Sequence, residues 1–197
     1  MTFHAIAHAV FAGAVLLLAS PPFAKAEELG PAVGEIIPHS LEISDAAGEP
    51  QSFETLVGEN GMALFFVRSV EWCPFCKAQA IGVNEARAEF EERGLSVVFV
   101  SYDPAEKQTA FVKQNDFAPP LLSDPRSEII DAFGLRNEAH KEGRFAGIPH
   151  PAAFIVAPDR TIIAKLYEED YASNDKSYRN RPAVDAVLAA ADAALAD

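Results

Sequence analysis

Four runs of apolar residues have the length and continuity of buried strands. Residues 62–68 (MALFFVR) and 95–101 (LSVVFVS) are almost wholly apolar, as expected of strands that are covered on both faces of a sheet. Residues 152–157 and 161–166 have a similar character and are joined by the turn Pro158-Asp159-Arg160. We therefore predict two buried strands in the middle of the chain and an antiparallel pair near its end.

Helix signals lie between these runs. Residues 74–93 place Pro74 in a first turn and are followed by Gly94, which are the positions that Pro and Gly favour at helix ends. A second helix is expected from Asp103, as its cap, to about Asn115.

The remaining segments complete an alternating order of strands and helices. Residues 41–44 predict a short strand, and residues 127–133 predict a short helix that precedes a polar loop over 135–148. Apolar side chains recur on one face of a last helix over 182–195. Strands that alternate with helices favour right-handed crossovers and parallel pairing. We expect one α/β domain with a central mixed sheet flanked by helices.

Residues 1–26 have the pattern of an export signal. A short apolar run over 9–20 is followed by Ala24-Lys25-Ala26, which fits a signal-peptidase site. The usual Lys or Arg is absent from the front, where only His4 and His8 precede the run. We expect a cleaved signal peptide and a periplasmic or otherwise exported protein. The alternative is an uncleaved anchor that holds the same domain at a membrane.

Charge and size restrict the partners. Removing the 26-residue leader from the 197 residues leaves 171, which is enough for one domain with a sizeable core. The leader contains one Lys and no acid, so its removal moves the formal net charge from −13 to −14. Such a surface repels nucleic acid and anionic lipid. No later segment is long and apolar enough to cross a bilayer.

The only two cysteines, Cys73 and Cys76, lie between the strand 62–68 and the helix 74–93. An exported protein meets an oxidising compartment, in which cysteines commonly form structural disulfides. A disulfide across so small a loop stabilises a protein by roughly 2 kcal/mol, which a domain of this size does not require. We therefore interpret the pair as a redox couple that closes into a disulfide and reopens. We expect neither a cofactor nor a metal.

The position of the pair suits thiolate chemistry. The thiolate is the attacking species, and the first turn of a helix stabilises it through unpaired N–H groups and the helix dipole. We expect Cys73 to be exposed enough to attack, and Cys76, one turn on, to be more buried and to resolve the mixed disulfide. Pro74 fixes the backbone of this turn.

Five neighbours of the pair each have a functional and a structural interpretation. Trp72 shields the pair or is an ordinary buried aromatic, and Arg68 stabilises a thiolate or is a surface charge at a strand end. Glu71 is interpreted as a solvated acid rather than a proton shuttle, and Asp103 as a helix cap rather than a catalytic acid. Phe75 is assigned to the core or its rim.

A second group, Gly147-Ile148-Pro149-His150-Pro151, directly precedes the strand 152–157. Two prolines before a buried strand indicate a loop of fixed geometry, and one X–Pro bond there is a candidate cis peptide. We expect His150 and Pro151 to shape a groove opposite the cysteines.

With these residues the chain resembles the thioredoxin fold and, within it, the alkyl hydroperoxide reductase / thiol-specific antioxidant family of peroxiredoxin-like redoxins. The similarity covers residues 30–166 and includes the opening Val33-Gly34-Glu35-Ile36-Ile37-Pro38, the strand residues 63–66, the strand 97–101 ahead of Asp103, and residues 153–156 before Asp159. The resemblance implies a thioredoxin-like redoxin domain over 27–197. It also implies a thiol-dependent antioxidant enzyme that has thiol or disulfide proteins as reductant or substrate.

The site departs from that family. A peroxiredoxin carries Pro-x-x-x-Thr/Ser-x-x-Cys. With Cys76 in the peroxidatic place, Cys73 and Ser69 occupy the Thr/Ser and Pro positions, and with Cys73 there, Val70 and Phe66 occupy them. The chain therefore resembles a peroxiredoxin in its frame and a thiol–disulfide oxidoreductase at its site. Pro151 strengthens this view, since it stands where peroxiredoxins have an Arg and thioredoxin-like oxidoreductases have a cis-proline.

Three functions follow as hypotheses. The leading one is an exported thiol–disulfide oxidoreductase with Cys73 as nucleophile and Cys76 as resolving thiol. The second is a two-cysteine thiol peroxidase that reduces hydroperoxides, in which one cysteine becomes a sulfenic acid and the other condenses with it. The third is a copper carrier that uses both cysteines and His150. Copper-carrying redoxins usually space their cysteines by three residues, whereas two separate them here.

Residues 167–181 are rich in charge and Tyr. We interpret them as a solvated connection to the last helix in preference to a surface that recognises a partner. His39 and His140 show no ligand spacing and are expected at the surface.

Overall fold

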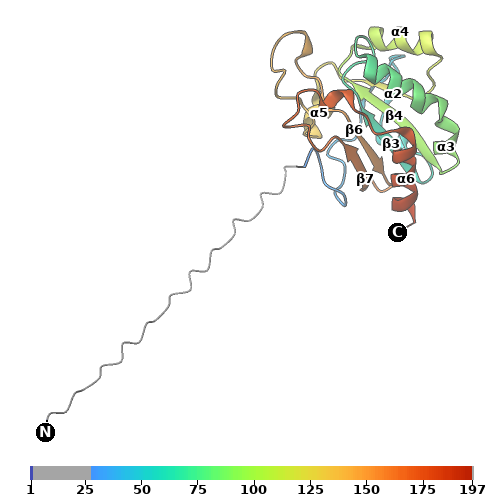
Figure 1. Cartoon of the computed structure of the whole chain (residues 1–197). Helices are drawn as coiled ribbons and strands as arrows, with labels where there is room; N and C mark the ends of the chain where they lie inside the picture. The colour runs from blue at the N-terminus through green and yellow to red at the C-terminus, as the bar shows by residue number, and fades with distance from the viewer. Residues whose placement is uncertain (2–27, 197) are drawn as a thin grey trace.

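A five-stranded mixed sheet organises the computed structural model, which describes Met1 and residues 28–196 (Figure 1). Its strand order is β5-β4-β3-β6-β7. The strands are β3 (Gly61–Phe66), β4 (Leu95–Ser101), β5 (Leu121–Ser123), β6 (Ala152–Val156) and β7 (Ile162–Tyr167). β3, β4 and β5 run parallel, whereas β6 is antiparallel to both β3 and β7. The predicted α/β fold and its closing antiparallel pair are confirmed.

Helices cover both faces of this sheet. The helices are α1 (Phe53–Leu56), α2 (Pro74–Glu85), α3 (Arg87–Glu91), α4 (Ala105–Asn115), α5 (Glu128–Ala132) and α6 (Val184–Leu195). Buried residues of α2, α3, α4 and α6 pack on one face, and those of α1 and α5 pack on the other. Two cores result, because successive strand residues point to opposite faces. Phe65 and Phe99 stack at 4.8 Å in the first core, and Phe66 and Phe133 meet at 4.7 Å in the second.

Short elements complete the fold. β1 (Ile43–Ser44) and β2 (Pro50–Gln51) form a separate antiparallel hairpin. Single 3-10 turns occur at Gly143–Phe145 and Ser177–Arg179. The second turn belongs to the connection between β7 and α6, residues 168–183, which we call the β7–α6 segment. In Figure 1 this segment is drawn in orange to red and joins the edge strand to the last helix.

Several element boundaries differ from the predictions. The helix predicted over 74–93 is divided at Ala86, which is the C-cap of α2 and the N-cap of α3. β5 was missed because it has three residues and directly follows two prolines. The strand predicted over 41–44 shrinks to two residues, since Leu41 adopts a positive φ of 58°.

The predicted leader lies outside the described residues, apart from Met1. Within the described part of the chain, no helix combines the length and apolarity that a membrane span requires.

Candidate active site

Cys73 and Cys76 form a disulfide at the first turn of α2. Cys73 is the N-cap residue, and its sulfur accepts a 3.3 Å hydrogen bond from the backbone N–H of Cys76. Pro74 follows as the first helical residue, where a missing N–H leaves no helical bond unmade. The sulfur of Cys73 therefore faces the positive end of the helix dipole.

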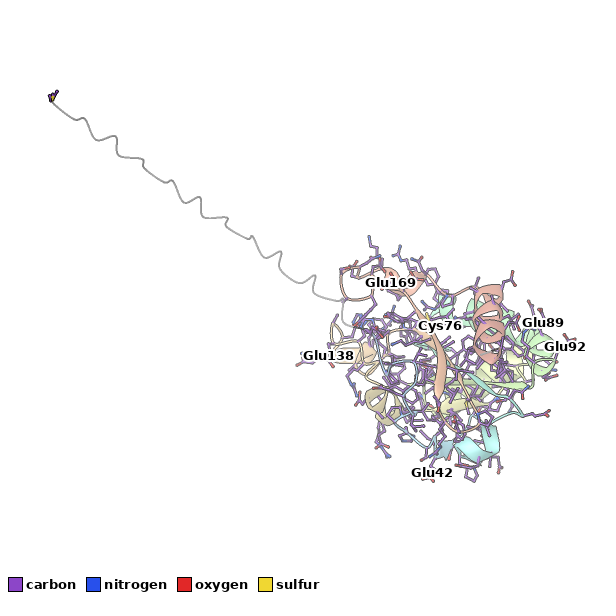
Figure 2. The ribbon with its side chains drawn as sticks, turned by 90° about the horizontal axis from the view of Figure 1, so that it is seen from below. Glu42, Cys76, Glu89, Glu92, Glu138 and Glu169 are labelled. Atoms are coloured by element: carbon purple, nitrogen blue, oxygen red, sulfur yellow. A yellow bond between two sulfur atoms is a disulfide. The ribbon has the colours of Figure 1, made fainter. Side chains whose placement is uncertain are left out.

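The disulfide is not exposed. Cys73 and Cys76 have 1% and 0% of their surface accessible to solvent. Figure 2 shows Cys76 inside the molecule, whereas the labelled glutamates lie on its outside. The prediction that Cys73 is exposed enough to attack is therefore wrong. The β7–α6 segment contributes to this burial because its Arg181 reaches both sulfur atoms.

Arg181 is a charged residue in contact with the disulfide. Its Nη2 lies 3.4 Å from Sγ of Cys76 and 4.0 Å from Sγ of Cys73. Its Nη1 donates to the backbone carbonyls of Tyr178 and Asn180. Burial lowers the pKa of Arg181 to about 10, and the positive charge of Arg68 contributes in the same direction. The guanidinium remains a cation at neutral pH and is held against the sulfurs by its own backbone.

Arg68 follows β3 and is buried, with 5% of its surface exposed. Its guanidinium lies 4.0 Å from the ring centre of Tyr178 and 5.2 Å from that of Trp72, which is cation–π geometry. Its Nε has no hydrogen-bond partner among the described residues. Burial lowers the pKa of Arg68. The interpretation of Arg68 as a surface charge is therefore wrong.

Trp72 connects the cysteine loop to other parts of the chain. The side chain is half-buried and packs on the first core, and its Nε1–H donates a 2.9 Å hydrogen bond to the hydroxyl of Tyr102. That hydroxyl donates in turn to the carbonyl of Arg144 at 2.9 Å. The ring also meets Phe145 at 4.6 Å. Trp72 thus ties the cysteine loop to the loop that precedes β6.

The loop with His150 and Pro151 lies at the same edge of the sheet as the cysteine loop. Ala152, directly after Pro151, pairs with Phe66 at the end of β3, and positive charge on Arg68 acts on His150. The backbone N–H of His150 donates a 2.7 Å hydrogen bond to Leu135. No peptide bond in the described chain is cis, so the candidate cis-proline is not found. The backbone hydrogen bond from His150 to Leu135 holds the loop instead.

Desolvation dominates the chemistry of His150. Burial and the charges of Arg68 and His140 lower its pKa to about 4. Its ring packs against that of Tyr171 at 4.9 Å. His150 is therefore a neutral imidazole at neutral pH that borders the β7–α6 segment.

Asp103 has a different task from the predicted one. Pro104, not Asp103, is the N-cap of α4. The buried carboxylate of Asp103 accepts hydrogen bonds from the backbone N–H of Val70 and the hydroxyls of Ser69 and Ser101. It thereby holds the loop that leads into Cys73.

The other singled-out residues lie at the rim or the surface. Glu71 forms an exposed ion pair with Lys107 at 2.8 Å, which agrees with a solvated acid. Phe75 is 38% exposed, and its ring lies 6.1 Å from that of Tyr178. His39 uses its Nδ1 to accept a bond from the backbone of Leu41.

The copper-carrier hypothesis requires Cys73, Cys76 and His150 as ligands. No group of three or more His, Cys, Asp or Glu side chains suited to a metal ion occurs among the described residues. His150 is therefore not gathered with the two sulfurs into a ligand set.

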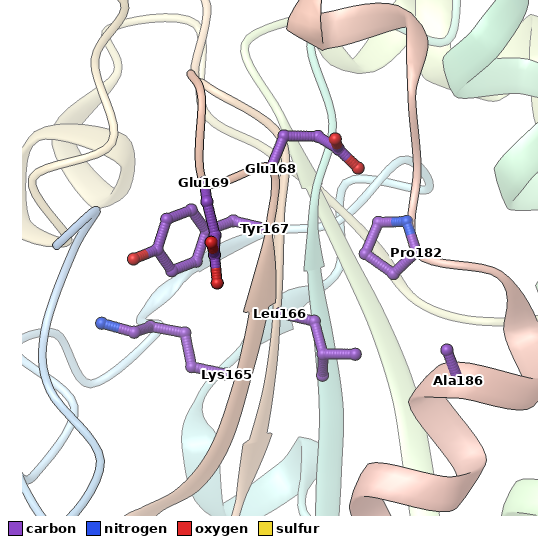
Figure 3. A pocket seen from close by; sticks show the side chains of 7 residues that line it. All are labelled: Lys165, Leu166, Tyr167, Glu168, Glu169, Pro182 and Ala186. Atoms are coloured by element: carbon purple, nitrogen blue, oxygen red, sulfur yellow. The ribbon is translucent and has the colours of Figure 1, made fainter. Parts of the chain in front are cut away.

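A cavity of about 350 Å³ lies beside the β7–α6 segment. Figure 3 shows it between the end of β7 and the start of α6, lined by Lys165, Leu166, Tyr167, Glu168, Glu169, Pro182 and Ala186. Neither cysteine belongs to its lining, so the cavity is not the site of the disulfide chemistry. It does leave open space beside Pro182, the residue after Arg181.

Arg181 and Tyr178 are the site residues that the sequence did not reveal. Both lie in a polar stretch, Ser177-Tyr178-Arg179-Asn180-Arg181-Pro182, that was assigned to solvent. The available signal was local: a Tyr, two Arg and a Pro close together in an otherwise acidic chain. Spacing along the sequence does not show that this stretch returns to a cysteine 105 residues earlier.

In a comparison with protein families, residues 33–165 match the AhpC/TSA family over more than half of the chain. The chain belongs to this family. Membership makes it a thiol-dependent oxidoreductase with a thioredoxin-like fold, as the sequence predicted. The AhpC/TSA match ends before the β7–α6 segment, so Arg181 lies outside the matched region.

Individual proteins that are similar to this AhpC/TSA protein are named peroxiredoxins or peroxidoxins. Peroxiredoxin Bcp of Escherichia coli (strain K12) is 26% identical over 129 residues, which are 66% of this chain and 81% of that protein. The crystal structure of peroxidoxin BcpB from Mycobacterium tuberculosis is similar with a TM-score of 0.66 and 25% identity, over 82% of this chain and 96% of that one. Peroxiredoxin Q of Xanthomonas campestris shares the fold with a TM-score of 0.65 and 22% identity, over 83% and 98% of the two chains.

Proposed function

We propose that this protein is a two-cysteine thiol peroxidase in which Cys73 attacks the hydroperoxide and Cys76 resolves. The observation that carries the proposal is the Cys73–Cys76 disulfide at the leading edge of α2 in an AhpC/TSA frame. The similarity to proteins named peroxiredoxins favours peroxide as the oxidant.

The proposed reaction has three steps. The thiolate of Cys73 attacks a hydroperoxide oxygen, and the O–O bond breaks to give a sulfenic acid and, after protonation, an alcohol or water. The thiol of Cys76 then attacks the sulfenic sulfur, so that the S–S bond forms and water leaves. An external thiol reductant supplies two electrons through a mixed disulfide and restores both thiols.

The surroundings of the sulfurs support the first step. The backbone N–H of Cys76 and the guanidinium of Arg181 both point at sulfur. Positive charge and N–H donors stabilise a thiolate and lower the thiol pKa. Sulfur in the thiolate form is the species that peroxide oxidises.

A second candidate is the thiol–disulfide oxidoreductase. Within the described residues, the recorded hydrogen-bond donors to the two sulfurs are the Cys76 N–H and Arg181, and no Thr or Ser hydroxyl is among them. Ser69, the nearest preceding Ser, is engaged by Asp103 at 2.7 Å. The site thus lacks the hydroxyl of the peroxiredoxin motif, and this favours exchange with protein disulfides.

One experiment separates the two candidates. Trp72 is the only tryptophan of the chain and precedes Cys73, so its fluorescence reports the state of the pair. Reduced protein is mixed with limiting hydrogen peroxide or with glutathione disulfide in a stopped-flow instrument. A peroxidase is expected to react with peroxide at least about a hundredfold faster than free cysteine does, the size of effect that fixed donors give. Slow reaction with peroxide and fast exchange would instead support the oxidoreductase.

Matched variants identify the roles of the cysteines. Cys73→Ser is expected to abolish the fluorescence change with peroxide. Cys76→Ser is expected to stop at the sulfenic acid, which a dimedone probe traps and mass spectrometry detects. The reverse pattern would assign the attack to Cys76.

Export of this enzyme is also a proposal. The apolar run and Ala24-x-Ala26 of the leader support it. Expression of the full chain in a Gram-negative host, followed by fractionation and intact-mass analysis, tests it. Mature protein that begins at Glu27 in the periplasm supports a cleaved signal, whereas a full-length membrane-bound form supports the anchor.

A further inference from the structure

The buried surroundings of the disulfide contain two arginines for which the described part of the chain provides no ion pair. None of the ion pairs recorded within the described chain includes Arg68 or Arg181. Glu168 attracts Arg181 from beyond ion-pair distance and accepts a hydrogen bond from Asn180 instead. Among the described residues, the buried Nε atoms of both arginines have no hydrogen-bond partner.

This arrangement is unfavourable while the sulfurs are neutral. A buried cation is costly unless an anion or several hydrogen bonds compensate it. A disulfide carries no charge, so it gives the guanidinium of Arg181 only a weak acceptor. The cost of burial is visible in the lowered pKa values of both arginines.

Reduction creates the missing anion. Two electrons and one proton convert the disulfide into one thiol and one thiolate. Whichever sulfur keeps the negative charge, it lies 3.4 or 4.0 Å from Nη2 of Arg181 in the present geometry. At that distance and in a buried setting, the attraction between the two charges is much stronger than in bulk water.

We propose that Arg181 is the counter-ion of the reduced cysteine pair and that the β7–α6 segment is a redox-coupled cover, held more tightly over the thiolate than over the disulfide. The inference deepens the proposed function and rests on redox use of the pair, but it does not depend on which oxidant is used.

Apart from Ser177, the residues of the segment are exposed or half-buried, so one added ionic contact changes its stability appreciably. Tyr178 stacks on Arg68 and touches Phe75, and Tyr171 packs on His150. At its end, the segment borders the open cavity beside Pro182 instead of close-packed core. Segments with few buried apolar contacts open at low free energy.

The coupling acts in both directions. If the thiolate favours the closed segment by some factor, the closed segment favours the thiolate by the same factor. The closed segment should therefore lower the thiol pKa and make the pair easier to reduce. Conversely, oxidation should loosen the cover and admit an external reductant to the disulfide.

The redox equilibrium tests the counter-ion. The wild-type protein, Arg181→Met, Arg181→Lys and Arg179→Met are equilibrated with glutathione redox buffers, and the thiol pKa is followed by thiolate absorbance. Arg179 is the matched control, because it is exposed in the same segment and its recorded side-chain contact is with the ring of Tyr178, whereas Arg181 is the arginine recorded at the sulfurs. For Arg181→Met we expect a roughly tenfold shift toward the disulfide, or about 30 mV for a two-electron couple, and a thiol pKa about one unit higher.

Arg181→Lys guards against a merely structural effect. Lysine keeps the positive charge but cannot make all the contacts of the guanidinium. Arg181→Lys should therefore retain at least about half of the lowering of the thiol pKa. Arg179→Met should stay within about twofold of the wild type. If Arg181→Met and Arg179→Met shift the equilibrium and the pKa equally, Arg181 is not the counter-ion.

Hydrogen exchange tests the cover. Amides of residues 168–183 are followed in the reduced and the oxidised protein. Exchange in the reduced wild type should be roughly tenfold slower, and this difference should disappear in Arg181→Met but persist in Arg179→Met. Equal exchange in the two wild-type redox states, or a difference that survives in Arg181→Met, would overturn the cover. Neither measurement uses peroxide, so a failed peroxidase assay and a failed cover are told apart.

Discussion

The backbone N–H of Val70 donates a 2.7 Å hydrogen bond to the carboxylate of Asp103. The hydroxyl of Ser69 donates to the other carboxylate oxygen at 2.7 Å, and Asp103 is 1% exposed. This buried carboxylate therefore connects the end of β4 to the loop that presents Cys73. We regard Asp103 as a positioning residue for the cysteine pair.

Asp103→Ala is expected to destabilise the protein by about 2–4 kcal/mol, because it leaves at least two buried donors unpaired. Asp103→Asn keeps the shape and one acceptor oxygen, so it should cost about half as much. Urea denaturation of the oxidised proteins measures both values. An Asp103→Ala protein as stable as the wild type would show that the loop is held by other contacts.

The lowered pKa of His150 should make the free energy of unfolding depend on pH. Its folded pKa is lowered from 6.5 to about 4, so between these values the unfolded chain binds a proton that the folded chain does not. Stability should be unaffected by this group above pH 6.5 and should fall as the pH drops toward 4, by at most about 1.4 kcal/mol per pH unit. Urea denaturation at pH 7, 6 and 5 measures the slope.

His150→Gln is the control for this pH dependence. Burial raises the pKa values of Asp103 and Asp124, and their protonation favours the folded state on acidification. Only the difference between wild type and variant therefore isolates His150. If the variant loses as much stability as the wild type between pH 7 and 5, the histidine is not responsible.

The contact between Tyr178 and Arg68 should control how fast reagents reach the cysteines. Tyr178→Ala removes the ring that stacks on Arg68, a contact worth about 1 kcal/mol or more. Opening of the β7–α6 segment should then be roughly fivefold more frequent or greater, and iodoacetamide should alkylate the reduced cysteines faster by the same factor. Tyr178→Phe keeps the ring but loses the hydroxyl, which also interacts with Arg68, so its rate should lie closer to that of the wild type than to that of Tyr178→Ala. Identical rates for all three proteins would mean that access does not pass through this segment.

Substitution of Gly61 should cause a large loss of stability. It has a φ of +124°, and a Cβ there would collide with the backbone carbonyl of Val156. Gly61→Ala should cost about 3 kcal/mol or more through backbone strain and displacement of β6. Gly48 also has a positive φ, of +86°, but nothing lies near its Cβ position, so Gly48→Ala should cost only about 1 kcal/mol. Thermal or urea unfolding compares them, and equal losses would contradict the steric argument.

Buried strands were predictable because their residues are apolar almost without interruption. The expected strand 95–101 coincides with β4, and 62–68 overlaps β3 except at its ends. β5 escaped because three residues after Pro119-Pro120 carry too little pattern. The division of the helix at Ala86 also has no clear signal, although Gly82 lies four residues before it.

The candidate site was predictable only in its local part. The Cys73-x-x-Cys76 spacing and Pro74 predict a dithiol at a helix start from neighbouring residues alone. Arg181 reaches Cys76 over 105 residues, and no periodicity in a polar segment reveals such a contact. Burial of Arg68 was missed for a related reason, since one of the two rings that cover it, Tyr178, comes from a distant part of the chain, whereas Trp72 is its near neighbour in the sequence.

The β7–α6 segment is anchored at two ends, by a strand of the sheet and by a helix packed on the core. A tether of this kind limits both the amplitude and the duration of any excursion, since short loops close within about 10–100 ns once they are free to do so. We therefore expect the sulfurs to meet the solvent in brief episodes. Small uncharged oxidants reach the sulfurs most easily during such brief openings. A bulky protein reductant has to bind the open form of the segment and stabilise it.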